Sequence, residues 1–100
     1  MSRLLRITKP AQQDLEDIWL NLEPFGVELA DRRLDQIQRK FLQLQQFPGL
    51  GRSREALAPG LRSLRVQDLL IFYRSVAGRL IIVRVVQGQR DLQRLFGDAK

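Results

Sequence analysis

The chemistry open to this chain is limited first by the residue types that it lacks. It has neither cysteine nor histidine, which excludes thiol nucleophiles, imidazole general bases, disulfides and the usual zinc sites. Carboxylates, amines and the single tyrosine, Tyr73, are left for proton transfer. We therefore expect neither a metal ion nor another cofactor.

Positive charge is the strongest compositional feature. The formal net charge is +6, and it comes almost wholly from arginine, because Lys9, Lys40 and Lys100 are the only lysines. Guanidinium groups bind carboxylates and phosphates through paired hydrogen bonds. The charge predicts an acidic partner, either nucleic acid or an anionic protein segment. The alternative is a basic surface that is merely solvated.

The strongest strand signal lies at residues 80–86, where Arg84 alone interrupts an aliphatic run. Such a run predicts an interior strand with neighbours on both edges and an apolar layer on each face. A cation in this setting needs a carboxylate partner or a route to solvent. Gly88 ends the strand, and the polar tail that follows is expected to matter more for function than for folding.

The remaining pattern predicts two helices and three further strands. Residues 3–8 form a strand that ends before Pro10, and residues 61–66 and 69–76 form two more, with a turn at Ala77 and Gly78. Apolar spacing predicts a helix at 11–22 and a longer one around residues 30–44, forming a hairpin. Leu15, Ile18 and Trp19 are expected in the core. We therefore predict one α+β domain over residues 1–100, of βααβββ order, with an antiparallel sheet covered by an α-helical hairpin.

Three acidic residues lie early in the first predicted helix, namely Asp14, Glu16 and Asp17. Negative charge there is favoured by the helix dipole, so we expect these carboxylates to cap the helix and not to catalyse. The charged start of the chain and the lack of an apolar run of about 18 residues indicate neither a signal peptide nor a membrane span. A cytoplasmic protein is expected.

Five segments in order resemble the ParE branch of the ParE/RelE toxin superfamily. They are AQQDLEDIW in the first helix, FPGLGR at 47–52, GLRSLRV at 60–66, IFYR at 71–74 and VVQGQRDLQRLF at 85–96. The resemblance implies a compact RelE/ParE-like βααβββ fold and a bacterial toxin–antitoxin module of the kind that stabilises plasmids. It also implies inhibition of DNA gyrase by binding, with no catalytic residue. The implied partners are gyrase and a ParD-like antitoxin with an acidic segment, through which alone the toxin would reach operator DNA.

The RelE branch, which cuts messenger RNA on the ribosome with arginines, lysines and a C-terminal tyrosine, supplies the alternative. Here Phe96 stands where that tyrosine aligns and Leu70 where a sheet arginine aligns, although Arg90 matches a RelE-like arginine. Gln87 replaces a histidine that is common in the family. Phenylalanine has no hydroxyl for proton transfer, which favours the gyrase inhibitor over the ribosome-dependent endoribonuclease. A module that binds nucleic acid directly is a third, weaker possibility.

Candidate contact residues for the target or the antitoxin fall into two groups. Three arginines on neighbouring predicted strands concentrate positive potential, and Tyr73 is a strand residue whose hydroxyl is expected at the rim of the sheet. The second group follows Gly88 in the tail. The predicted contact residues are Arg62, Arg65, Tyr73, Arg74, Gln89, Arg90, Arg94 and Phe96.

Overall fold

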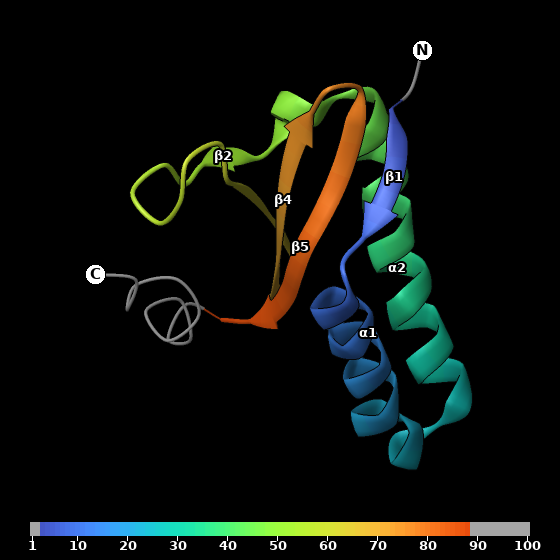
Figure 1. Ribbon diagram of the computed structural model, residues 1–100. Coiled ribbons are helices and arrows are strands. Elements are labelled where there is room, and N and C mark those ends of the chain that lie inside the picture. The colour runs from blue at the N-terminus through green and yellow to red at the C-terminus, as the bar shows by residue number, and fades with distance from the viewer. Residues whose placement is uncertain (1–2, 89–100) are drawn as a thin grey trace.

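The computed structural model describes residues 3–88 of the chain (Figure 1). The elements are β1 (Leu4–Ile7), α1 (Lys9–Leu22), the 3-10 turn η1 (Glu23–Phe25), α2 (Val27–Gln46), the 3-10 turn η2 (Pro48–Leu50), β2 (Arg52–Ser53), β3 (Arg62–Val66), β4 (Leu69–Val76) and β5 (Arg79–Gln87). The predicted α+β class and the order of the main elements are confirmed. Neither helix is long and apolar enough to cross a membrane.

The five strands form one sheet in the order β1-β5-β4-β3-β2. β5 is an interior strand, as predicted, although β4 lies at the centre. The sheet is mixed and not purely antiparallel, because β1 runs parallel to β5 while the other pairs are antiparallel. β2 was not predicted, since two residues are too few to show a strand period.

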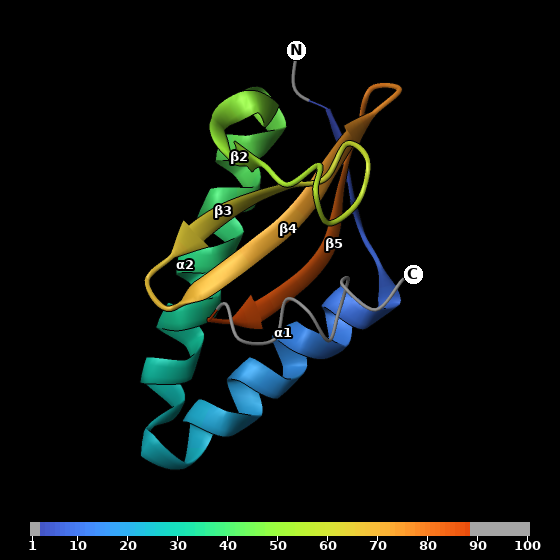
Figure 2. The same cartoon turned by 90° about the vertical axis from the view of Figure 1, so that its left-hand side faces the viewer.

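The two helices cover one face of the sheet, and the loop that follows β2 lies on the other side (Figures 1 and 2). The side chain of Thr8 caps α1 by accepting a hydrogen bond from the amide of Ala11, and Pro10 occupies the first turn. Trp19 corrects the sequence prediction. It is only half-buried, and its indole N–H donates to Asp31 of α2 at 2.8 Å, joining the two helices.

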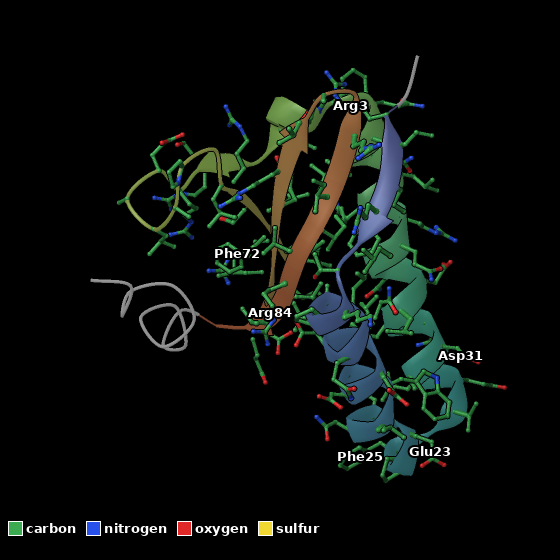
Figure 3. The ribbon with its side chains drawn as sticks, in the orientation of Figure 1. Arg3, Glu23, Phe25, Asp31, Phe72 and Arg84 are labelled. Atoms are coloured by element: carbon green, nitrogen blue, oxygen red, sulfur yellow. The ribbon has the colours of Figure 1, made fainter. Side chains whose placement is uncertain are left out.

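Apolar side chains cover both faces of β4 and β5, as the sequence predicted. Alternate residues of the strands face the helices, and these pack with the buried side chains of α2: Ile71, Tyr73, Leu80, Ile82 and Val85 with Ile37, Phe41 and Leu44. A smaller cluster lies on the other face, where the loop after β2 contributes: Leu57, Ala58, Leu61, Leu70, Phe72 and Val86. Figure 3 shows Phe72 on the side away from the helices. We call this second side the open face.

Asp14 of α1 joins the helical layer to the edge of β5 beyond the end of β1. Its carboxylate accepts hydrogen bonds from Nε and Nη2 of Arg84, at 2.7 and 2.8 Å, and from the amide of Val85 at 2.9 Å. Thr8 extends the same contact by donating its hydroxyl proton to the carbonyl oxygen of Val83 at 2.9 Å. The hydrogen bonds that Arg84 donates to Asp14 raise the pKa of Arg84, so its guanidinium is charged at neutral pH.

The Asp14 contact corrects the sequence prediction that this carboxylate caps its own helix. α1 begins at Lys9 and has no acidic residue in its first turn, so Asp14 lies too far along the helix to act on the terminal amides. Its side chain extends across to the sheet instead, and it is the partner that Arg84 required. Figure 3 shows Arg84 at the end of β5 beside the start of α1.

The Asp14→Ala variant should be clearly less stable than the wild type. It removes a charge partner of Arg84 and leaves the amide of Val85 without its acceptor, which we expect to lower the free energy of unfolding by about 2–3 kcal/mol. Glu16→Ala, at an exposed position of the same helix, is the matched control and should cost less than about 0.5 kcal/mol. Urea denaturation measures both, and equal stability of the two variants would show that the contact contributes nothing.

Candidate functional site

Tyr73 lies in the interior of the protein, which corrects the expectation that its hydroxyl is at the rim. The residue is 0% exposed. Its hydroxyl donates to the carbonyl oxygen of Pro48 at 2.7 Å and accepts from the amide of Gly51 at 2.8 Å. The phenol thus holds the segment 48–51 against the helix-facing side of β4, and its donor is fully used.

Burial raises the pKa of Tyr73 above its ordinary value of 10.0. Because the folded pKa exceeds the unfolded one, the neutral phenol stabilises the fold fully below about pH 10, and this contribution is lost as the pH rises through the folded pKa. A phenol that is buried, fully bonded and protonated at neutral pH cannot exchange protons with a bound substrate. Tyr73 therefore has a structural role and is not a general acid or base of this site.

Arg62 belongs to the same structural contact. It lies opposite Tyr73 in the β3–β4 register, and its Nη1 donates to the carbonyl oxygen of Gly51 at 2.7 Å. Arg65 and Arg74 lie at positions of opposite parity, in register with Leu70 and Ile81, and so start from the side of the open face. Arg65 belongs to the part of β3 that β2 does not cover, and its Nη1 donates to the carbonyl oxygen of Gln67 at that edge. The three arginines predicted from the sequence are therefore not brought together.

Arg54 joins the open-face arginines, and it was not among the residues singled out in the sequence. Its Nε donates to Ser63 at 2.8 Å, and its guanidinium carbon lies 5.9 Å from the centre of the Phe72 ring. Burial, followed by repulsion from Arg52 and Arg65, lowers the pKa of Arg54, which indicates that these cations lie close together. Arg54 belongs to a loop, where no periodic pattern indicates which way a side chain faces. Only its positive charge could have suggested it as a contact residue.

Arg74 carries an unsatisfied group. Its Nε is buried and has no hydrogen-bond partner among the described residues. Buried donors without an acceptor are rare in folded proteins, and each calls for an explanation such as an ordered water or a bound ion. The open face therefore combines Arg54, Arg65 and Arg74 with Phe72, and the Nε of Arg74 is a buried donor without an acceptor among the described residues.

The other predicted contact residues lie outside the described part of the chain: Gln89, Arg90, Arg94 and Phe96. Within residues 3–88, no group of three or more acidic side chains is arranged to hold a metal ion. What the described site offers chemically is charge and hydrogen-bond donors on a fixed sheet, which suits the recognition of an anionic partner.

Comparison with known proteins identifies the family to which the chain belongs. The family model of the ParE toxin of the type II toxin–antitoxin system, parDE, matches residues 5–92. Toxin ParE3 of Caulobacter vibrioides is 35% identical over 98 residues, covering 97% of each chain. Toxin ParE1 of Mycobacterium tuberculosis is 30% identical over 96 residues, covering 94% of this chain and 98% of its own.

Two solved structures share the fold. The chromosomal ParDE system from P. aeruginosa superposes with a TM-score of 0.76 at 24% identity, covering 88% of this chain and 98% of the matched chain. The toxin–antitoxin complex RelBE2 from Mycobacterium tuberculosis gives a TM-score of 0.60 at 23% identity, covering 87% and 99%. The fold is that of the small toxins of type II toxin–antitoxin modules. Among them, this chain belongs to the ParE toxin family.

The Gly51→Ala variant tests the contact around Tyr73. A Cβ atom at residue 51 would lie 2.5 Å from the Tyr73 hydroxyl oxygen and 2.6 Å from the carbonyl oxygen of Ser63, too close for either to remain in place. We expect a loss of about 2–4 kcal/mol in the free energy of unfolding, as for other overpacked buried sites. At residue 49 an added Cβ meets nothing within 4 Å, so Gly49→Ala is the control and should change stability by less than about 1 kcal/mol. Thermal unfolding measures the melting temperatures of both variants. Equal melting temperatures for Gly51→Ala and Gly49→Ala would contradict the described packing around Tyr73.

Proposed function

We propose that this ParE-family toxin inhibits DNA gyrase by binding and without catalysis. The observation that carries the proposal is the burial of Tyr73, the only tyrosine of a chain that has no histidine. With its phenol fixed between Pro48 and Gly51, the described part of the chain lacks an aromatic or imidazole group that could move a proton on a substrate. Recognition through charge is the chemistry that remains, and family membership favours gyrase as the target.

The proposed contact surface is the open face together with the tail. Arg65 and Arg74 present positive charge beside the apolar cluster around Phe72, and guanidinium groups of this kind pair with anionic groups on a target. Arg54 is added to the residues predicted from the sequence, whereas Arg62 and Tyr73 position the surface from within. The tail residues Gln89, Arg90, Arg94 and Phe96 remain proposed contacts.

A ParD-like antitoxin with an acidic segment is the proposed neutralising partner. The net charge of +6 favours an anionic segment that orders on binding, and the structural relatives are toxin–antitoxin assemblies. In this proposal the toxin acts in the cytoplasm, where gyrase works. The toxin contacts operator DNA only through the antitoxin. The likeness to the RelBE2 complex keeps ribosome-dependent cleavage of messenger RNA as the second candidate.

Two assays with purified components separate the candidates. The protein should block the supercoiling of relaxed plasmid by gyrase and leave ribosome-bound messenger RNA intact. Arg74→Gln should raise the inhibitory concentration about tenfold, because one guanidinium contact to an anionic group contributes on the order of 1.5–3 kcal/mol. Arg79→Gln, an equal charge change at an exposed position of β5, should shift it less than about twofold.

The proposal fails if messenger RNA is cut at defined codons and gyrase is unaffected. If Arg74→Gln and Arg79→Gln both inhibit gyrase as strongly as the wild type, the open face is not the contact surface for gyrase. The melting temperatures of both variants should equal that of the wild type, because neither substitution removes a hydrogen bond seen in the structure.

A further inference from the structure

A basic groove runs between α2 and β3, on a part of the molecule that the proposed gyrase contact does not use apart from Arg65. Two adjoining hollows of about 440 and 160 Å³ form it, and they share Gln36 and Gln67. We call it the α2–β3 groove. Five cations line it: Arg32, Arg33, Arg39, Lys40 and Arg65. Figure 2 shows α2 running behind β3 along this side of the sheet.

The positive charge of the groove is only partly compensated. Asp68 pairs with Arg33 and Asp35 pairs with Arg39, both at 2.9 Å. The five cations and these two carboxylates leave three positive charges, half of the +6 that the whole chain carries. A concave surface of one sign concentrates the field and attracts polyanions.

Arg32, Lys40 and Arg65 have no carboxylate partner among the described residues. Their side chains contact neutral acceptors or make no hydrogen bond there. Lys40 contacts the amide oxygen of Gln43, and Arg65 contacts the carbonyl oxygen of Gln67, each at 3.4 Å. No hydrogen bond of the Arg32 side chain is seen among the described residues. These long contacts to neutral acceptors leave the charges available to an anion.

The lining of the groove favours a phosphate backbone over an acidic protein segment. Within residues 3–88, its lining side chains are nearly all cations and amides, and Leu29 and Val66 are the only apolar ones. Phosphate oxygens are bound in nucleic-acid complexes by arginine, lysine and glutamine side chains of this kind. A protein segment that orders on binding needs apolar anchor sites, which this groove does not offer.

The form of the groove favours a double helix over a single strand. The cations that α2 contributes extend from residue 32 to residue 40, a length of about 12 Å at 1.5 Å per residue. Among the described residues, no aromatic side chain lines it, and single-stranded nucleic acid is typically held by stacking its bases on aromatic rings. We propose that the α2–β3 groove binds the phosphate backbone of duplex DNA directly, without sequence preference and without the antitoxin or gyrase.

Fluorescence anisotropy with the full-length purified protein and a labelled DNA duplex of arbitrary sequence tests the proposal. The variant Arg32→Gln/Lys40→Gln removes two charges from α2 and keeps good helix formers at both positions. The matched control, Arg6→Gln/Arg79→Gln, removes two charges from exposed positions on β1 and β5. The groove variant should bind DNA at least about tenfold more weakly, and the control less than about threefold.

Salt dependence gives the second measurement. The slope of log K against log salt changes by about 0.9 for each phosphate contact, so the groove variant should lose about 2 units of slope and the control almost none. Unchanged melting temperatures would show that both variants are folded.

Several outcomes would overturn the proposal. Equal weakening by the two variants would mean that only net charge matters. Tighter binding to single-stranded DNA or to poly-glutamate than to the duplex, lost in the groove variant alone, would assign the groove to a different partner. The absence of measurable duplex binding at low salt would reject it outright. None of these results bears on gyrase inhibition, which is measured separately.

Discussion

The hydroxyl group of Tyr73 fixes the part of the structure on which the open face depends. A buried hydroxyl must find partners, and here they are the main-chain groups of Pro48 and Gly51, at the point where α2 has ended and the chain returns to the sheet. Gly51 has to be glycine because a Cβ would collide with that hydroxyl. The chain then enters β2, pairs with β3, and extends over the open face. This anchor acts together with the Arg62 hydrogen bond to Gly51 and the β2–β3 pairing to fix the start of the loop that carries Arg54.

Asp14 has the corresponding role toward the opposite edge of the sheet, where β5 lies beside β1. β1 covers only the first part of β5, and the edge beyond it is completed by the start of α1 through Thr8 and Asp14. Arg3 and Gln45 add a reciprocal link between the start of β1 and the end of α2. The helical hairpin is therefore held to the sheet by polar contacts as well as by its apolar face. The way in which the hairpin packs on the sheet sets the position of α2 beside β3, and so the position of the α2–β3 groove.

Much of the fold could be predicted from the sequence because its elements have strong local patterns. The apolar periods of α2 and the aliphatic runs of β4 and β5 determine element type, and the order of elements then limits the topology. The parallel pairing of β1 could not be predicted in this way, because strand direction is decided by how the hairpin packs. Trp19 was placed in the core because of its type, whereas its polar edge binds Asp31.

The candidate site was less predictable, since it depends on contacts between residues far apart in the chain. The sequence indicated that Arg84 needs a partner, but not that it is Asp14, 70 positions away. Tyr73 was expected at the surface because its hydroxyl is polar, yet residues 22 and 25 positions earlier enclose it. Arg62 and Arg65 looked equivalent, and strand alternation separates them. Arg62 contributes to the contact around Tyr73, and Arg65 belongs to the surface that we propose for recognition.

We propose that the only phenol of this toxin is structural and that the protein acts by binding. Titration of tyrosine ultraviolet absorbance tests this directly, because Tyr73 is the single tyrosine and its signal has no overlap with another phenol. Circular dichroism recorded on the same samples reports the fold. The account predicts that tyrosinate appears only above the ordinary pKa of about 10, together with loss of the folded signal. Reversible ionisation at or below that value in a protein that stays folded would contradict it and would restore Tyr73 as a group available for catalysis.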